Sequence, residues 1–374
     1  MNKSIRLCII NRNYPPDKGA TGYYASRLVQ FLQRDDKFEI TIVTVGDRVD
    51  TSMIKYVKGS YEGKVKWRRL FSTYFEGRKL VKKALNIDAD VYIVMTDPPF
   101  LNYWASKLLS SRKWILWSMD LFPEAFAANS LIDTQHVLYR HYESSLRTSP
   151  PSFLISLGDA QLEHLKQAYY PLTEGLALPI GIRESMAGKT NLRKQKNTET
   201  TIVFGYAGSI GEAHDAEAIV TLVKSLNPQD HSFVLSCRGS KSSYVISKLR
   251  DIEYVTFKEE LSEEEIGEID IHVVSLIDKW THICVPSKAL SAVQKERPVL
   301  FIGSEKSDTW QLINGAGWRL SKDYDILDFL KDLNPEVLGL KKNKAKEVSS
   351  ILLKQYDEGL FQIKKRLERL KSDA

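Results

Sequence analysis

Short apolar runs alternate with amphipathic segments along most of this 374-residue chain. Most runs have Gly, Pro, Asp or Ser on at least one side, a pattern that predicts buried strands, whereas apolar residues three and four positions apart predict helices. The predicted strands are 5–10, 39–45, 90–95, 114–119, 153–157, 201–207, 232–237, 254–257, 271–274 and 299–302, and the main predicted helices are 23–32, 213–226, 289–295 and 344–370. Strands alternating with helices are typical of parallel α/β sheets.

The alternation breaks once, near the middle of the chain. The segment 178–182, LPIGI, has the character of a crossover between domains, and the polar segment 190–200 follows it before a new strand begins at Thr201. A chain of this length usually forms two domains. We therefore predict an α/β fold with two domains, 1–180 and 181–344.

Composition and cysteine use indicate a soluble intracellular protein. Hydrophobic residues make up 43% and charged residues 27% of the chain, and there is no run of 18 apolar residues that would form a transmembrane helix. The apolar core at the N-terminus is too short for a signal peptide. Cys8, Cys237 and Cys284 each lie in or beside an apolar run, so we expect three buried free thiols in a reducing cytoplasm.

The net charge of +6 is mild, but basic residues are concentrated between Lys55 and Lys83. Only Glu62 and Glu76 oppose them, and aromatic residues are interleaved. The basic residues are Lys55, Lys58, Lys64, Lys66, Arg68, Arg69, Arg78, Lys79, Lys82 and Lys83, and the aromatic ones include Trp67, Phe71, Tyr74 and Phe75. This pattern favours an anionic membrane surface as a partner. A solvated helix face over core aromatics is the alternative, and we expect no nucleic acid.

Acidic residues follow three successive predicted strands, at Asp97, Asp120 and Asp159. The carboxyl ends of parallel strands lie at one edge of a sheet, so these residues should line one rim. We expect Asp97 and Asp159 to be helix N-caps. Asp120 and Glu124 stand in an apolar, aromatic segment, where a purely structural carboxylate is less favourable, so they are candidates for chemistry.

Two loops are further candidates for a binding site. The loop from Pro16 to Gly22 follows the first strand, but it lacks the GxGxxG fingerprint of dinucleotide-binding proteins. In the second loop, Ser287 is a predicted N-cap and Lys288 lies beside the start of a helix. A helix N-terminus and a lysine suit a phosphate group. An ordinary capped βαβ unit is the alternative interpretation of that second loop.

Four segments together resemble retaining GT-B glycosyltransferases of the family-4 type, in particular bacterial enzymes of capsule, exopolysaccharide or O-antigen synthesis. They are YPPDKGATG at 14–22, DLFPE at 120–124, FGYAGSIG at 204–211 and VPSKALSAVQKERPVLF at 285–301. The resemblance implies two Rossmann-like domains facing across a cleft. It places the donor nucleotide in the second domain and the acceptor in the first, which the final helix, about 345–374, joins.

The resemblance also implies roles for individual residues. Arg238 and Lys288 would stabilise negative charge on the leaving diphosphate, and Asp120 would position or deprotonate the acceptor hydroxyl. Donor contacts would come from Gly208, Ser209, Gly211, Gly239, Pro286, Ser287 and Ser291, and acceptor contacts from Gly19, Thr21, Tyr23 and Glu124. No protein nucleophile is required, and we expect no metal or other cofactor because no His/Asp/Glu cluster has metal-ligand spacing.

The sequence departs from the family pattern in the second domain. Ser291 and Ile283 occupy two positions where the family has Glu, and Glu296 replaces a Gly. The basic residues that usually follow the glycine turn at 208–211 are also missing, because Glu212, His214 and Asp215 stand there. The charge for a diphosphate must then come from elsewhere, which is why Arg238 and Lys288 are the candidates.

Three functions remain open at this point. The first is transfer of a sugar from a nucleotide-sugar, with UDP-sugar preferred from family frequency, to a lipid-linked or polysaccharide acceptor with retention of configuration. Such an enzyme would be cytoplasmic, peripheral on the inner face of the plasma membrane. The second is an epimerase-like nucleotide-sugar enzyme without a lipid acceptor, and the third is a non-catalytic sugar-binding partner subunit.

Overall fold

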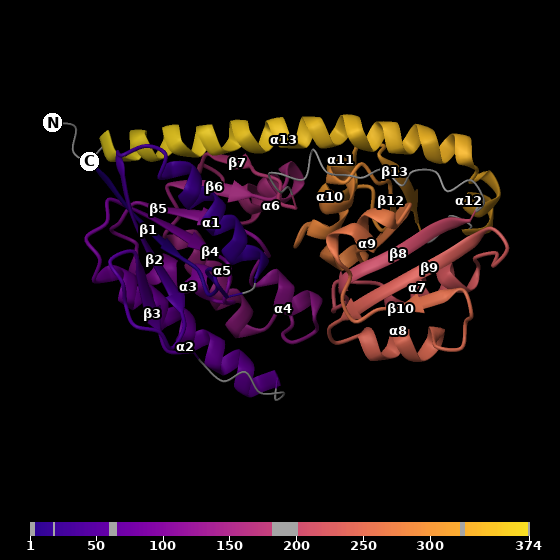
Figure 1. Ribbon diagram of the computed structural model, residues 1–374. Helices are drawn as coiled ribbons and strands as arrows, with labels where there is room; N and C mark the ends of the chain where they lie inside the picture. Colours follow the sequence, from indigo (N-terminus) through magenta and orange to yellow (C-terminus); the bar gives the residue numbers. More distant parts are fainter. Residues whose placement is uncertain (1–3, 18, 60–65, 182–200, 322–325, 373–374) are drawn as a thin grey trace. The chain divides into compact units, whose positions relative to one another are not determined.

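The computed structural model describes residues 4–17, 19–59, 66–181, 201–321 and 326–372. Lys64 and Glu62 lie outside this part of the chain. The protein divides into two compact units, one made of Met1–Leu178 with Asp357–Ala374 and the other of Pro179–Tyr356. Each unit is built around one parallel sheet (Figure 1).

The first unit has a seven-stranded sheet in the order β3-β2-β1-β4-β5-β6-β7. Its strands are β1 Ile5–Ile10, β2 Phe38–Val45, β3 Ile54–Val57, β4 Val91–Met95, β5 Trp114–Trp117, β6 Phe153–Ser156 and β7 Gly175–Ala177. Its helices are α1 Ala20–Leu32, α2 Lys66–Leu85, α3 Leu101–Leu108, α4 Glu124–Ala128, α5 Val137–Thr148 and α6 Asp159–Ala168. Every residue of β4, β5 and β6 is buried, as expected for parallel strands with helices on both faces.

Helices α2, α3 and α5 pack against one another in series in this unit. The last part of α13, a helix that spans Pro335–Ser372, packs beside α1. The rings of Phe31 and Phe361 meet edge to face with centroids 5.1 Å apart, and Lys364 forms an ion pair of 2.8 Å with Asp35. Residues 357–372 therefore complete the first unit although they are last in the chain.

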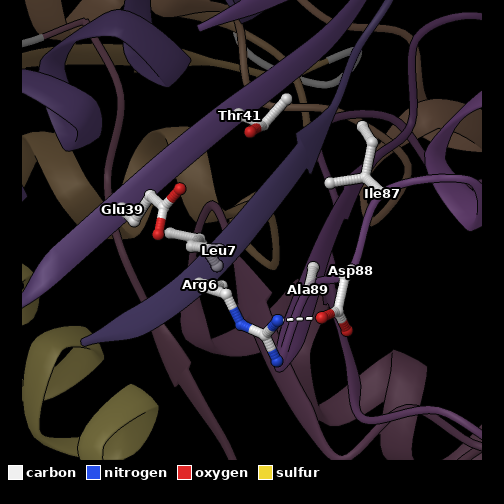
Figure 2. Close-up of a pocket in the computed structure, with 7 residues that line it drawn as sticks. All are labelled: Arg6, Leu7, Glu39, Thr41, Ile87, Asp88 and Ala89. Atoms are coloured by element: carbon white, nitrogen blue, oxygen red, sulfur yellow. Dashed lines mark hydrogen bonds and ion pairs between the residues drawn. The ribbon is translucent and has the colours of Figure 1, made fainter. Parts of the chain in front are cut away.

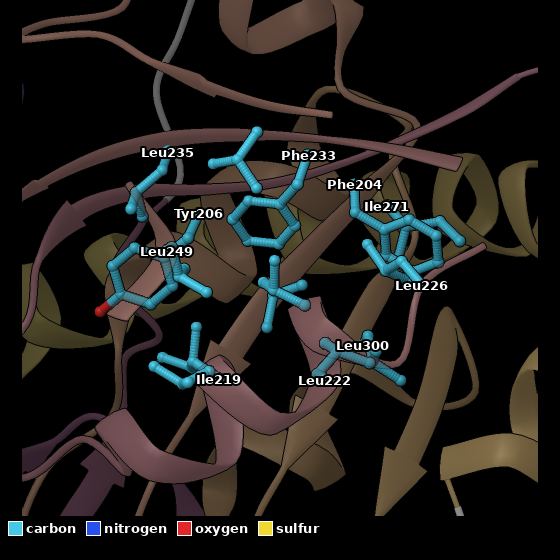
Figure 3. Close-up of a cluster of buried hydrophobic side chains, with 14 of the residues drawn as sticks. Phe204, Tyr206, Ile219, Leu222, Leu226, Phe233, Leu235, Leu249, Ile271 and Leu300 are labelled. Atoms are coloured by element: carbon cyan, nitrogen blue, oxygen red, sulfur yellow. The ribbon is translucent and has the colours of Figure 1, made fainter. Parts of the chain in front are cut away.

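The second unit has a six-stranded sheet in the order β10-β9-β8-β11-β12-β13. Its strands are β8 Ile202–Ser209, β9 His231–Arg238, β10 Val255–Phe257, β11 Ile271–Ser275, β12 Val299–Ile302 and β13 Gly317–Leu320. Its helices are α7 Ala216–Lys224, α8 Ser242–Leu249, α9 Glu263–Glu268, η1 Asp278–Trp280, α10 Ser287–Gln294, α11 Asp308–Ile313, α12 Ile326–Asp332 and the first part of α13. Figure 3 shows its core, in which Phe204 and Phe233 of the sheet pack over Ile219 of α7.

Within each sheet all strand pairings are parallel, so the carboxyl ends of its strands lie along one edge of that sheet. The order of strands reverses between β1 and β4 in the first sheet and between β8 and β11 in the second. Ligands of open α/β sheets bind beyond the carboxyl ends at such switch points. We therefore expect ligand-binding residues at these two positions.

The predicted strands are all present, with differences of a few residues at their ends. The sequence analysis missed the edge strands β3, β7 and β13, which are short and whose apolar pattern is weak. Helix α1 begins at Ala20 rather than Tyr23, and β8 continues through Gly208 and Ser209. All three cysteines are free; Cys8 is buried, whereas Cys237 and Cys284 are only half-buried.

Three predicted N-caps are wrong. The cap of α3 is Phe100, three residues beyond Asp97; the cap of α6 is Gly158. Asp159 is instead the first helical residue, where a negative charge is still favourable near the positive end of the helix. Ser287 is likewise the first residue of α10, its cap is Pro286, and no side chain caps that helix. In each case the backbone turns into the helix at a different residue from the one that carries the preferred capping side chain.

Candidate functional site

The glycine turn at the end of β8 leaves open space at the switch point of the second sheet. Gly208 has a φ of +119°, and a Cβ at Gly208 or Gly211 would meet no atom within 4 Å. The side chain of Ser209 between them is exposed. A ligand can therefore approach the backbone closely here, and Gly208 is also the residue type that its φ favours.

Gly239 is required for a different reason. Its φ is +110°, and a Cβ there would lie 2.7 Å from the carbonyl oxygen of Ile210. The backbone N–H of Ile210 donates to the carbonyl of Arg238 at 2.7 Å, and that of Lys241 donates to the carbonyl of Ile210 at 3.2 Å. Gly239 thus allows the segments after β8 and β9 to pack together, which places Arg238 beside the glycine turn.

The ammonium group of Lys288 lies against the glycine turn rather than in open solvent. It donates to the carbonyl of Ser209 at 2.7 Å and to the hydroxyl of Tyr206 at 2.5 Å, and it lies 3.3 Å from Nε2 of His214. His214 Nδ1 faces the carbonyl of Ser275 at 2.7 Å, so Nδ1 carries the proton and Nε2 is the acceptor. All three ammonium donors of Lys288 are therefore used within this unit.

Burial lowers the pKa of Lys288 to about 7, despite the nearby Cys284 and Cys237 sulfurs, which raise it. The pKa of His214 is lowered to about 4, first by burial and then by the charge of Lys288. The lysine charge is thus partly lost near neutral pH, while the histidine stays neutral. An anionic ligand at the glycine turn would favour the charged form of Lys288.

Arg238 presents a full charge at the same rim. Its side chain is exposed, and within the described residues its guanidinium has no hydrogen-bond or ion-pair partner. The register pairs Arg238 with Ser209 across β8 and β9. Of the two cations predicted for this site, Arg238 is therefore the one whose donors are available to a ligand.

Pro286, Ser287 and Ser291 lie at the start of α10. The hydroxyl of Ser291, which stands where the resembled family has Glu, donates to the carbonyl of Gly181 at 3.0 Å, so this side chain already has a partner. Gly181 has a φ of +102°, and a Cβ there would lie 2.7 Å from the carbonyl of Ser287. These contacts fasten the crossover segment to α10 within the second unit.

A polar network occupies the switch point of the first sheet. The side chain of Asp97 accepts from Asn13 Nδ2 at 2.6 Å and from the hydroxyl of Thr21 at 3.2 Å. Asn11 Nδ2 donates to Thr21 Oγ1 at 3.1 Å. Burial raises the pKa of Asp97, against the charge of Arg12 and these hydrogen bonds, which lower it. Asp97 is therefore not a helix cap but the centre of this network, to which the predicted residue Thr21 belongs.

Asp120 follows β5 at the same rim, and its side chain is exposed. Its backbone N–H and that of Met119 donate to the hydroxyl of Thr96, at 3.1 and 2.9 Å, which ties the ends of β4 and β5 together. Its carboxylate has no hydrogen-bond partner within the described residues. Although this side chain is exposed at the surface, the protein atoms around it desolvate the carboxylate, and this effect, followed by the charge of Asp97, raises the pKa of Asp120 to about 6. A carboxylate of this kind suits a general base near neutral pH.

The other predicted acceptor residues lie in two different places. Gly19 is the N-cap of α1 and Tyr23 lies in its first turn, close to Thr21. Glu124 is the first residue of α4, and its Oε1 accepts from the hydroxyl of Tyr169 at 2.8 Å and lies 3.2 Å from His164 Nε2. Its Oε2 is buried without a hydrogen bond from any described residue. Glu124 therefore belongs to a cluster of its own.

The sequence analysis missed several residues at these rims. Tyr206 and His214 hold Lys288, but neither stands in a pattern that marks it beforehand. Glu76 was counted among the charges of the basic stretch, yet it is fully buried and its Oε1 lies 3.1 Å from Arg12 Nε. A single acid in an otherwise basic amphipathic helix is a weak signal of such a buried ion pair.

Two pockets in the surface lie away from the switch points of the two sheets. A hollow of about 260 Å³ lies at the amino-terminal edge of the first sheet, where Arg6 pairs with Asp88 (Figure 2). Another, of about 480 Å³, lies over α11, beside Trp310 and Gln311. Across the described residues, no three His, Cys, Asp or Glu side chains are grouped so that they could hold a metal ion.

No protein-family model and no curated protein matches the chain. Several solved structures do match it. Sucrose-phosphate synthase from Thermosynechococcus elongatus has a TM-score of 0.73 at 11% identity, covering 100% of both chains. WaaG, a glycosyltransferase involved in lipopolysaccharide biosynthesis, has a TM-score of 0.65 at 14% identity, covering 95% of this chain and 98% of the other.

A third similar structure is Anabaena HepE in complex with UDP, with a TM-score of 0.63 at 12% identity, covering 99% of this chain and 100% of that one. HepE has also been solved with UDP and glucose. Identities this low establish the fold and not the activity. Together with the two parallel sheets, they show that this chain has the GT-B fold, with two Rossmann-like units.

Proposed function

We propose that this protein is a glycosyltransferase that moves a sugar from a nucleotide-sugar, by preference a UDP-sugar, to a lipid-linked or polysaccharide acceptor with retention of configuration. The second unit, Pro179–Tyr356, which contains the predicted donor domain 181–344, binds the donor. The first unit, Met1–Leu178 with the end of α13, binds the acceptor. The proposal draws on the residue pattern, on the GT-B fold and on the rims of the two sheets.

The observation that carries the proposal is the open glycine turn at the switch point of the second sheet. Gly208 and Gly211 leave their backbone accessible, and beside them stands the guanidinium of Arg238, which has no partner among the described residues. Backbone N–H groups and a basic side chain are what a leaving nucleoside diphosphate requires. The complexes of HepE with UDP and with UDP and glucose support a nucleotide-sugar as the ligand.

On the acceptor side, Asp120 supplies a carboxylate that no described residue hydrogen-bonds. The reaction needs the acceptor hydroxyl to lose its proton as it attacks the sugar, and a carboxylate within hydrogen-bond reach can take that proton. Retention requires no nucleophile from the protein, because in this scheme the hydroxyl attacks from the side that the nucleotide leaves. Gly19, Thr21 and Tyr23 at the start of α1 provide further contacts for the acceptor.

A thermal-shift screen tests the donor. Binding to the folded state raises the melting temperature by mass action, so UDP, GDP, ADP and dTDP are compared at equal concentration. We expect a rise with UDP that exceeds the rise with the other three. No rise with any nucleoside diphosphate contradicts the proposal.

A non-catalytic sugar-binding subunit is the second candidate. The engagement of Lys288 by Tyr206, Ser209 and His214 favours it, because this cation has no donor left for a phosphate. Hydrolysis of a panel of nucleotide-sugars without acceptor separates the two functions. Slow release of UDP from one sugar nucleotide supports an enzyme, whereas binding without any release supports the subunit.

Replacement of Arg238 by Ala is expected to weaken binding of UDP by about 1.5 kcal/mol, or roughly tenfold, the low end for a hydrogen bond to a charged group. The reason is that the exposed guanidinium has no other partner among the described residues. Arg250→Ala, another exposed arginine, at the end of α8, is the control. Titration calorimetry measures both affinities, and equal values for Arg238→Ala and the unchanged protein exclude a role for Arg238.

The exposed face of helix α2 supports the proposal that the stretch 55–83 contacts an anionic membrane surface. Phe71 is 67% and Phe75 38% exposed, and Arg68, Lys79 and Lys82 are exposed on the same helix. The single acid of α2, Glu76, is buried against Arg12, so it does not offset these charges at the surface. Lys83 pairs with Asp50 and contributes less. No described helix has the length and apolarity to cross a membrane.

The triple variant Arg68→Glu, Lys79→Glu and Lys82→Glu should release the protein from vesicles that contain an anionic lipid. Each basic residue near such a surface contributes about 1 kcal/mol, and binding should also fall with salt as the Debye length shrinks to about 3 Å at 1 M. Co-sedimentation measures both effects. Arg34→Glu, Lys365→Glu and Arg369→Glu change the net charge equally elsewhere in the unit, and this control should stay bound. If both triple variants are released from the vesicles equally, net charge alone controls the binding and α2 has no special role.

A further inference from the structure

The side chain of Thr96 holds the backbone that carries Asp120. Thr96 follows β4 and is 4% exposed, and its hydroxyl oxygen accepts from the backbone N–H of Met119 at 2.9 Å and from that of Asp120 at 3.1 Å. A hydroxyl oxygen has two lone pairs, and these two N–H groups use both of them. Thr96 is therefore the buried partner of two successive peptide groups just after β5.

A second buried side chain holds the other side of the same turn. Gln161 of α6 is fully buried; its Nε2 donates to the carbonyl of Met119 at 3.2 Å, and its Oε1 accepts from the N–H of Leu157 at 2.9 Å. The backbone of residues 119 and 120 is thus fixed from β4 and from α6. The carboxylate of Asp120 has no hydrogen bond with a described residue, so its position follows from the position of this backbone.

Thr96 is also the residue before Asp97, so one segment supplies both the hydroxyl and a negative charge to the turn. Desolvation and then the charge of Asp97 raise the pKa of Asp120 to about 6. The other charged groups here face Asp97: desolvation raises the pKa of Asp97, the charge of Arg12 lowers it and the charge of Glu76 raises it. Strands β4 and β5 are neighbours, and the hydrogen bonds of Thr96 keep the two carboxylates at their ends close together.

We propose that Thr96 is a positioning residue for the reaction, which holds the carboxylate of Asp120 beside Asp97 and within reach of the acceptor hydroxyl. This inference rests on the proposed function, in which Asp120 takes the proton of that hydroxyl. A base must lie within hydrogen-bond reach of the proton that it takes, and a misplacement of about 1 Å can lower a rate by about 10²-fold. An exposed carboxylate without a hydrogen bond to the described residues meets this demand only if its backbone is held.

Thr96→Val tests this role, because valine has nearly the same shape but no lone pair for the two N–H groups. Thr96→Ser keeps the oxygen and is the conservative variant. Thr73→Val is the matched control, since Thr73 lies in α2 of the same unit, is also 4% exposed and donates its hydroxyl to the carbonyl of Leu70 at 2.8 Å. Should Thr96→Val fail to fold, Thr96→Ala, which removes the same oxygen without adding bulk, takes its place.

Carbon-13 NMR of protein labelled at its aspartate carboxyl groups measures the first effect without a substrate. The signal of Asp120 is the one that disappears in Asp120→Asn. We expect its pKa, about 6 in the unchanged protein, to fall in Thr96→Val towards the ordinary value of about 3.9, because the carboxylate moves away from Asp97 and into water. It should stay where it is in Thr96→Ser and Thr73→Val. An unchanged pKa of Asp120 in folded Thr96→Val overturns the inference.

The variant Asp97→Asn shows whether the effect passes through the charge of Asp97. In protein that already carries Asp97→Asn, Thr96→Val should lower the pKa of Asp120 by less than it does alone, because the interaction that it weakens is already absent. Equal falls in the two backgrounds mean that Thr96 controls only the hydration of the carboxylate, and the placement beside Asp97 is then wrong.

Release of UDP from UDP-glucose, UDP-galactose and UDP-N-acetylglucosamine, with water as the acceptor, measures the effect on the reaction. Thr96→Val should lower kcat roughly ten- to hundredfold and move the rise of the rate with pH to lower pH. The KM for the UDP-sugar and the thermal shift with UDP should not change, and Thr96→Ser and Thr73→Val should react as the unchanged protein does.

The two possible failures are distinguishable. If Asp120→Asn lowers kcat but Thr96→Val does not, the positioning role of Thr96 is wrong and the proposed function stands. If the unchanged protein shows neither a thermal shift with UDP nor release of UDP from any of the three sugars, the proposed function fails, whatever the NMR titration shows.

Discussion

Asp120→Asn is expected to reduce transfer to the acceptor by roughly 10²–10⁴-fold, the usual contribution of a general base, while UDP binds as before. The change keeps the shape of the side chain and removes the group that takes the proton. The carboxylate has no hydrogen-bond partner among the described residues, so no structural bond is lost. Steady-state turnover and UDP affinity are the two measurements, and near-normal turnover would show that Asp120 is not the base.

The pH dependence sharpens this test. The pKa of Asp120 is raised to about 6, so the base is protonated and inactive below that pH, and the rate should rise as pH increases through about 6. Because the charge of Asp97 contributes to this shift, Asp97→Asn should move the rise to lower pH. Asp159→Asn, at the end of the neighbouring strand β6, is the matched control and should leave the profile unchanged. A profile that stays flat between pH 5 and 8 in the unchanged protein contradicts the assignment.

Lys288→Ala is expected to weaken UDP binding by about 1–3 kcal/mol, because it removes a positive charge beside the glycine turn and leaves the groups that hold the ammonium without their donor. In the structure, Lys288 has no donor left to hydrogen-bond the diphosphate directly. The ammonium group holds the carbonyl of Ser209 and the hydroxyl of Tyr206, so it acts on the diphosphate through its charge and through the shape of the glycine turn. Calorimetry measures the loss, and unchanged affinity in a folded variant removes Lys288 from the donor site.

The same lysine predicts how affinity varies with pH. Its pKa is lowered to about 7, so the free protein loses this charge as pH rises through 7, and UDP affinity should fall between pH 6 and 8. In Lys288→Ala this fall should disappear. The control Lys279→Ala, an exposed lysine in η1, should keep both the affinity and its pH dependence. If the UDP affinity of Lys288→Ala still falls between pH 6 and 8, the pH dependence comes from another group.

The sequence by itself predicted ten of the thirteen described strands, and hence the rims. A buried strand is a local property, since its apolar run and the polar residues that end it are consecutive. For that reason Gly211, Asp97 and Asp120 could be placed just after strand ends from the sequence, and the structure confirms those places, whereas Gly208 is the last residue but one of β8. The α/β class and the GT-B fold followed from the same pattern together with the four motif segments.

Only the tertiary structure decided which of these residues have partners. Lys288 and Tyr206 are 82 positions apart, and Ser291 and Gly181 are 110 apart. Contacts at such separations depend on the order of strands in the sheet and on where each connection crosses it. The helix caps and the buried ion pair of Glu76 have the same origin, because each depends on how a helix is placed against its neighbours. An apolar or charged residue type says that a side chain needs a partner, but the packing of the elements determines which partner it meets.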